Sequence, residues 1–294
     1  MTEAATPIRF GFLLLKWEFK FDYGEVIVVP GFDDEAKSLE KQLHKDGYYY
    51  PPMVKTVVRS LDGKNSRTVP KTTRPARLYP VPASHQLNIA PNTPEANIRE
   101  GAAGFVIHFL AFLFQTRLQF SDWLIDGRIP MKRNRVLMNT PNEASVCLSH
   151  AFKIWSGWCD ADKKRFISIL FIHSRSAVYQ WGWEEFMIQY MVLDACWKMA
   201  ESLFDIKAKS HSDRANVLCK IFSLGLDNSF IDLNAMVKLR NDLFHESLWF
   251  QNRPGASIGR LPYHMPMRMR IMNQLLIVGL IEQAWVDEFK RRLF

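Results

Sequence analysis

The sequence lacks most of the motifs that define the common enzyme classes. It contains no glycine-rich phosphate loop, no Gly-x-Ser-x-Gly elbow and no His-Glu-x-x-His helix, so P-loop, α/β-hydrolase and zinc-peptidase chemistry are not indicated. Its most apolar run, Gly104–Phe114, has 11 residues and is too short to span a bilayer. No signal-like segment begins the chain, and we expect a cytoplasmic protein with no membrane partner.

Cysteine is also scarce. The chain has four cysteines and no Cys-x-x-Cys pair, which argues against a disulfide framework and favours reduced thiols. Cys147, His150 and Cys159 would supply three ligands to a metal, but the spacing offers no fourth. We therefore predict neither a metal site nor a cofactor.

Composition and charge set broad limits. The chain has 294 residues, of which 48% are hydrophobic and 13% aromatic, as expected of one large or two ordinary globular domains. The formal net charge is +8; residues 1–95 contribute +2 and residues 96–294 contribute +6. The basic excess is compatible with a polyanionic partner.

The first part of the chain is predicted to be rich in strands. Trp17, Phe19, Phe21 and Tyr23 alternate with polar residues, a period of two that is typical of a half-buried strand. The pair Asp62-Gly63 predicts a hairpin turn between two further strands. Six of the 15 prolines lie between residues 70 and 94 and indicate a boundary there, because each removes an amide donor. We expect an α+β protein with a β-rich domain at 1–92 and a larger all-α helical bundle at 93–294.

Capping signals and apolar periodicity predict the helices of the second part. Thr93-Pro94 and Thr140-Pro141 each place a capping hydroxyl before a first-turn proline. The expected helices cover residues 94–120, 141–158, 161–172, 177–204, 213–224, 231–246 and 267–293.

A cluster of basic residues lies between two of these helices. Arg128, Lys132, Arg133 and Arg135 could guide an RNA backbone. An ordinary solvated loop is the alternative interpretation.

The strongest chemical motif lies in the helix expected at 231–246. In a helix of about 100° per residue, Asn241 and His245 share one face and the long Arg240 side chain reaches toward the imidazole. A guanidinium that binds phosphate, beside an imidazole that titrates near neutral pH, suits phosphodiester chemistry without metal. The alternative is a surface arginine and a histidine that only stabilises a helix end.

The Arg-Asn-x3-His motif and the helices around it resemble the HEPN family of small helical domains. The similar part covers residues 175–293, with Arg240 and His245 at the positions of the family's arginine and histidine and Asn241 at its frequent polar position. The resemblance implies a HEPN-type bundle, a homodimer formed through the motif helices, and a ribonuclease of the toxin or anti-phage defence type. It equally allows a non-catalytic RNA- or protein-binding scaffold.

The expected reaction is cleavage of RNA by its own 2′-hydroxyl group. His245 would move protons and Arg240 would stabilise the charge on phosphorus oxygens, while Asn241 orients the imidazole or the phosphate. One imidazole does not easily serve both faces of an in-line step, so a two-fold dimer with two copies of His245 is predicted.

Residues 1–92 contain no catalytic constellation. We expect them to be a sensing or regulatory domain that recognises a protein or ligand trigger and controls access to the Arg240 and His245 site. The alternative is that their strands only cover the apolar helix at Gly104–Phe114.

Overall fold

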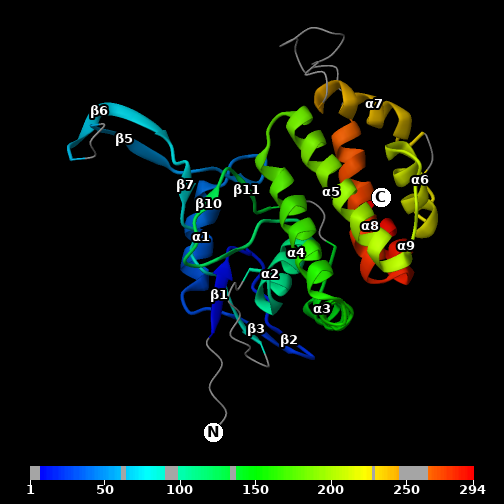
Figure 1. The fold of residues 1–294 in the computed structure, drawn as a ribbon. Helices are drawn as coiled ribbons and strands as arrows, with labels where there is room; N and C mark the ends of the chain where they lie inside the picture. Colours follow the sequence, from blue (N-terminus) through cyan, green and yellow to red (C-terminus); the bar gives the residue numbers. More distant parts are fainter. Residues whose placement is uncertain (1–6, 61–63, 90–98, 133–136, 227–228, 245–263) are drawn as a thin grey trace.

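The structure is a computed structural model of an α+β protein, strand-rich in its first part and helical after it (Figure 1). It describes residues 7–60, 64–89, 99–132, 137–226, 229–244 and 264–294, without the side chains of residues 70 and 71. The predicted α+β class is confirmed.

The largest sheet is antiparallel and has five strands. Its order is β2-β3-β8-β1-β9, with bounds Phe19–Phe21, Gly24–Val28, His85–Ile89, Ile8–Gly11 and Gln119–Phe120. In the central strand β8, His85, Leu87 and Ile89 are buried while the residues between them are partly exposed. This alternation gives the sheet one apolar face toward the helices. The strand predicted around Trp17–Tyr23 is confirmed only at its centre.

Three short strands that follow residue 93 in the sequence pair with strands of the first part of the chain. β9 pairs with β1, β10 (Ile125–Asp126) with β7 (Leu78–Tyr79), and β11 (Ile129–Pro130) with β4 (Tyr48–Tyr49). The helix α1 (Phe32–Gln42) covers a second apolar core that contains Phe32, Tyr79 and Ile129. Residues 8–89 and 119–130 thus share sheets and cores across the boundary expected at 92/93.

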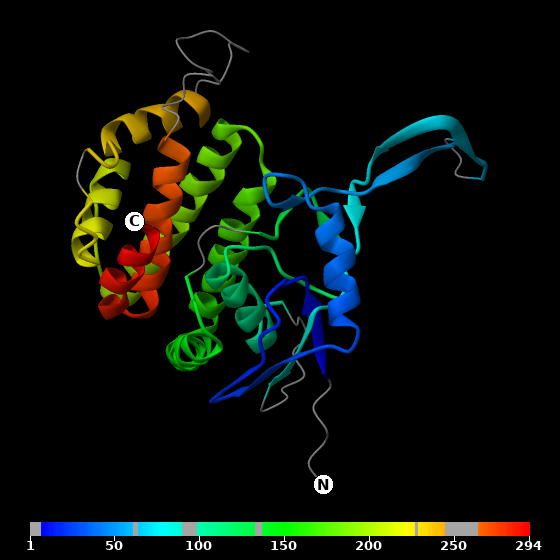
Figure 2. The same ribbon diagram turned by 180° about the vertical axis from the view of Figure 1, so that it is seen from behind.

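A long hairpin extends away from the body of the molecule (Figures 1 and 2). It consists of β5 (Met53–Arg59) and β6 (Ser66–Pro75), which pair antiparallel with a register shift between Lys55 and Val57. The predicted hairpin is confirmed, although its turn at Asp62-Gly63 lies outside the described residues. We refer to β5 and β6 as the β-arm.

The helix α2 (Ala102–Leu113) occupies the centre of the main core, and every residue from Ala103 to Leu113 is buried. The five-stranded sheet covers it: Phe10, Val26 and Leu87 belong to the same core. The expectation of a helix over 94–120 was wrong at both ends. Residues 99–101 precede the helix, and the cap expected at Thr93 lies outside the described residues. At the C-terminal end Gln115 adopts a φ of 53° and the chain turns into β9.

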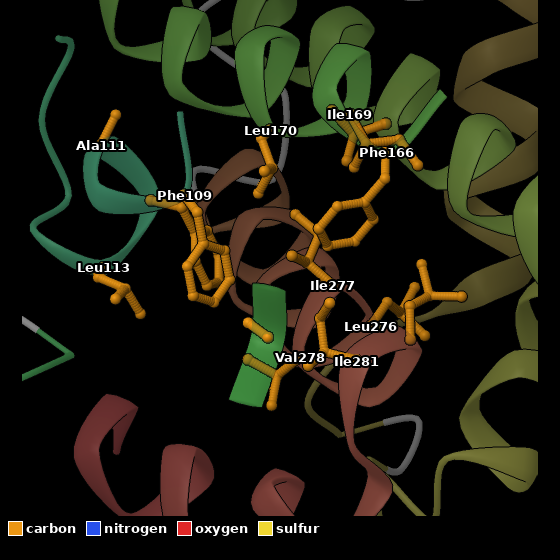
Figure 3. Packing of buried hydrophobic residues seen from close by; sticks show 14 of the residues in the cluster. Phe109, Ala111, Leu113, Phe166, Ile169, Leu170, Leu276, Ile277, Val278 and Ile281 are labelled. Carbon is orange, nitrogen blue, oxygen red and sulfur yellow. The ribbon is translucent and has the colours of Figure 1, made fainter. Parts of the chain in front are cut away.

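The remaining helices pack around α2 and α8 (Met265–Ile281). Figure 3 shows Phe109 of α2, Phe166 and Leu170 of α4, and Ile277 of α8 meeting in the core. The helices that pack around α2 and α8 are α3 (Pro141–Ser156), α4 (Asp160–Arg175), α5 (Gly182–Phe204), α6 (His211–Ile221), α7 (Leu233–Phe244) and α9 (Val286–Leu293). The Thr140 hydroxyl accepts from the Glu143 amide and caps α3 as predicted.

The structure differs from two of the predicted helices. The helix expected over 177–204 begins only at Gly182, after a 3₁₀ turn at Ser176–Val178. The helix expected over 267–293 breaks at Glu282, whose φ of −155° and ψ of 110° are extended. The Glu282 side chain instead accepts from the Ala284 amide and starts a new turn before α9.

None of the helices in the described part combines the length and the apolar character needed to cross a membrane.

Candidate functional site at the junction of α5, α6 and α7

The motif helix α7 is held on the bundle by its apolar face. Leu233 and Met236 are buried, and Asp232 Oδ1 accepts from the amides of Asn234 and Ala235 at 3.0 and 2.9 Å. This carboxylate satisfies amides that have no partner inside the helix. The predicted helix is therefore confirmed over 233–244, whereas His245 lies outside the described residues.

Arg240 points from α7 toward α5. Its guanidinium carbon lies 5.7 Å from the ring centre of Tyr190 and 5.2 Å from that of Phe244. Its Nη1 donates to Asn241 Oδ1 at 3.0 Å. Asn241 thus contacts the arginine next to it, and the aromatic rings hold the cation by their faces.

A second histidine lies in the same place. His211 is the first residue of α6, and its Nδ1 is 3.5 Å from Oδ1 of Asp194 on α5. Arg214, one turn further along α6, places Nη1 3.6 Å from the same oxygen. The rings of His211 and Tyr190 have centres 6.3 Å apart. We name Tyr190, Asp194, His211, Arg214 and Arg240 the junction cluster.

Burial and the charges of the cluster together determine the protonation of its histidine. Burial lowers the pKa of His211, with the cations Arg214 and Arg240 acting in the same direction and Asp194 opposing them. A lowered pKa keeps the imidazole neutral at pH 7. Burial likewise raises the pKa of Tyr190 to about 12, so its hydroxyl stays protonated.

Sequence reasoning alone missed His211, Asp194, Arg214 and Tyr190. Three helices supply the cluster, and no local motif links them. The available signal was the spacing of His211 and Arg214, which lie three residues apart on one helix face.

The predicted RNA-binding cluster divides into different environments. Arg128 donates to the carbonyls of Ala177 and Tyr179 at 2.9 and 2.8 Å and lies 4.2 Å from the Tyr48 ring centre. Lys132 forms an exposed ion pair with Glu40 at 3.0 Å. Arg133 and Arg135 lie outside the described residues. The Arg128 guanidinium is thereby bound to the protein itself.

Among the described residues, no group of three or more His, Cys, Asp or Glu side chains is arranged to hold a metal ion. Cys147 is buried. His150 Nε2 lies 3.1 Å from a Glu282 oxygen, and Cys159 donates to Asp162.

No protein-family model, curated protein sequence or solved structure matches this chain. Its function is therefore inferred from the residues of the site.

Proposed function

We propose that this chain is a metal-independent endoribonuclease, related to the HEPN domains and acting in a toxin or anti-phage defence role. The observation that carries the proposal is the convergence of a neutral imidazole, His211, with the guanidinium groups of Arg214 and Arg240. Guanidinium groups fork onto phosphate oxygens, and a neutral imidazole accepts a proton.

The reaction begins at the 2′-hydroxyl group, which RNA has and DNA lacks. With Nδ1 directed at Asp194, His211 presents Nε2 to take the hydroxyl proton. The 2′-oxygen bonds to phosphorus, and the bond from phosphorus to the 5′-oxygen breaks. Arg240 stabilises the negative charge that builds on the non-bridging oxygens. A general acid protonates the leaving 5′-oxygen, which yields a 2′,3′-cyclic phosphate and a 5′-hydroxyl.

We assign the general-acid role to His245, which follows α7 directly in the sequence. Either the same chain supplies both imidazoles, His211 and His245, or two chains pair through their α7 helices and each supplies a His245. A homodimer of this kind is part of the proposal, since isologous pairing is the commonest symmetry. Light scattering on the active protein tests it: a strict monomer that still cleaves RNA removes the need for two copies of His245.

One observation favours a second function. Arg240 is held by two aromatic rings and by Asn241, contacts that a purely structural arginine would also make. The second candidate is therefore a non-catalytic RNA- or protein-binding scaffold.

Cleavage of a labelled RNA by the purified protein in EDTA separates the two functions. We expect cleavage in EDTA and its loss in Arg240→Ala, His211→Ala and His245→Ala. Lys238→Ala is a matched control, because Lys238 is an exposed cation on the same helix. Cleavage that requires added metal, or that persists in all three variants, contradicts the proposal.

Expression in growing cells gives an independent readout. A ribonuclease should slow growth and His245→Ala should relieve the effect, whereas a scaffold should be tolerated in both forms.

A regulatory role of residues 1–92 is also proposed, in addition to their structural role. Their strands cover α2 and share its core, so deletion of 1–92 would expose that core and is expected to give an insoluble fragment. Substitutions on an exposed part of this region are the better test.

A further inference from the structure

The β-arm concentrates positive charge. Residues 53–75 contain six basic residues and one acidic residue, a net charge of +5 within a chain whose total is +8. Residues 1–95 together carry only +2, so the rest of that region is acidic. The charge is therefore localised on one protruding element (Figure 1).

Four of the basic side chains on the β-arm point into solvent. Lys55, Arg59, Arg67 and Arg74 are exposed, and no carboxylate of a described residue forms an ion pair with them. Unlike Arg128, these four cations have no hydrogen bond to a carbonyl and no cation–π contact within the part of the chain that the structure describes. They are available to an anionic partner.

The cations lie on both faces of the β-arm. Val58 is opposite Arg67 on one face near the tip, whereas Arg59 is opposite Ser66 on the other, because successive residues of a strand alternate. A ribbon that is basic on both faces is suited to a site with negative charge on both sides. A groove between two phosphate backbones is such a site.

The β-arm also carries apolar side chains that serve no core. Met53 is 60% exposed and Val57 and Val58 are each 46% exposed. None of them belongs to the two apolar cores of the described residues, so their apolar surface is open to a partner. In a DNA groove, small apolar groups contact the methyl groups of thymine.

We propose that the β-arm binds double-stranded DNA in its major groove. That groove is about 12 Å wide and admits a two-stranded β-ribbon, whereas the deep, narrow major groove of an RNA duplex does not admit side chains. Proteins that bind single strands stack bases on aromatic rings, and residues 53–75 contain none. Charge and shape together favour duplex DNA.

The dimensions agree with this partner. The ten residues of β6 span about 33 Å at about 3.3 Å per residue, close to one turn of DNA at about 34 Å. The irregular register at Lys55 and Val57 increases the local twist of such a ribbon, as needed to follow a helical groove. The proposal does not depend on ribonuclease activity.

Fluorescence anisotropy of the full-length protein with a labelled duplex of about two helical turns, roughly 20 base pairs, tests the proposal. The variant replaces Lys55, Arg59, Arg67 and Arg74 with alanine. The matched control replaces Lys37, Lys41, Lys45 and Lys209, which are exposed cations elsewhere, and removes the same total charge. Thermal melting of all three proteins verifies that they are folded.

We expect the β-arm variant to bind duplex DNA at least about thirtyfold more weakly than the control variant. The slope of the logarithm of the association constant against the logarithm of the salt concentration should become shallower by roughly 0.9 for each phosphate contact removed. Equal losses in the two variants would show a mere effect of net charge and overturn the proposal. Equal or tighter binding of single-stranded RNA or duplex RNA to the β-arm would overturn it as well. The proposal would also be overturned if the β-arm variant changed its oligomeric state but not its DNA affinity, because the β-arm would then be a contact between copies of the chain.

Discussion

The Nδ1 atom of His211 lies 3.5 Å from Oδ1 of Asp194, and Arg214 approaches the same carboxylate oxygen at 3.6 Å. The negative charge of Asp194 faces Nδ1 at this distance and favours a proton on that nitrogen. Burial and the cations Arg214 and Arg240 lower the pKa of this imidazole, and Asp194 acts in the opposite direction. Asp194 therefore partly offsets the positive charge of the two arginines beside His211.

Asp194→Asn should change the pH dependence of RNA cleavage. The negative charge of Asp194 raises the pKa of His211, against the effects of burial and of Arg214 and Arg240. Removing that charge lowers the pKa further, so the acid limb of the kcat/KM profile should move to lower pH. The plateau should fall, within the range of about 10²- to 10⁴-fold that general-base catalysis contributes, because the imidazole is less well oriented.

Asp205→Asn is the control for this experiment, since Asp205 is exposed, lies at the end of the same helix and has a φ of 46° that asparagine tolerates. An unchanged profile in Asp194→Asn would show that His211 is not the base.

Arg240→Ala should reduce kcat/KM for RNA by about 10²- to 10³-fold, because the developing charge on the phosphate loses its partner. The loss of stability should be about 0.5–2 kcal/mol, because Arg240 is only partly exposed and its cation–π contacts are partly desolvated. Arg240→Lys should restore only part of the rate, since an ammonium cannot fork onto two oxygens.

Steady-state cleavage and urea unfolding measure the two effects, with Lys238→Ala as the reference. A variant that unfolds readily but retains its specific activity would show that Arg240 is structural and takes no part in the cleavage.

The sequence allowed prediction of elements that depend on local signals. The capped helix at Thr140 and the helix around Arg240 follow from caps and apolar spacing, which are readable in a single segment. The strands β9, β10 and β11 have two residues each, too few to show any period. Their existence depends on partners earlier in the chain, so no local pattern predicts them.

The site was predictable only in part for the same reason. Arg240 and Asn241 are adjacent in a recognisable motif, whereas Asp194 and His211 come from other helices and meet only after folding. Charge counting over long windows concealed the β-arm, because the acidic residues around it reduced its +5 to +2 over residues 1–95. Local density of basic residues also gave no indication of the environment of Arg128, whose partners are backbone carbonyls that a sequence does not show.

Arg128→Ala should destabilise the fold. The guanidinium holds the carbonyls of Ala177 and Tyr179 where the chain turns toward α5, and hydrogen bonds to a charged donor contribute about 1.5–3 kcal/mol each. We expect a loss of at least about 2 kcal/mol in urea unfolding, with Arg128→Lys also destabilised because lysine lacks the fork. Lys132→Ala should cost at most about 1 kcal/mol, since its ion pair is exposed. If Arg128→Ala instead weakens RNA binding at unchanged stability, the predicted RNA-binding role is favoured.

Gly279→Ala should destabilise the protein despite the higher helix propensity of alanine. A Cβ atom at this position of α8 would lie 2.6 Å from a ring carbon of Phe222, and Phe222 is 1% exposed and cannot move into solvent. Overpacking of this kind costs about 1–3 kcal/mol, against a propensity gain of about 1 kcal/mol.

Differential scanning calorimetry should therefore show a lower Tm for Gly279→Ala, and the added substitution Phe222→Leu should recover part of it. Gly157→Ala is the control: it is in the right-handed helical region and its nearest contact is at 3.4 Å, so its Tm should not fall. An equal response of the two variants would contradict the steric explanation.

The stability of the fold should fall as pH decreases below about 6.5, because three histidines are buried in a neutral form. Burial lowers the pKa of His85 and His108 to about 4 and that of His173 to about 3. In the unfolded chain each has its ordinary pKa of about 6.5, so the unfolded state binds more protons between pH 6.5 and the folded pKa. Stability is fully present above pH 6.5 and is lost as pH falls toward 4, at about 1.4 kcal/mol per pH unit for each such histidine near pH 5. His108→Leu removes one of them and should reduce the slope of unfolding free energy against pH by about that amount. Urea titrations at several pH values measure the slopes, and an identical slope in His108→Leu and the parent protein would show that His108 is not neutral in the folded state.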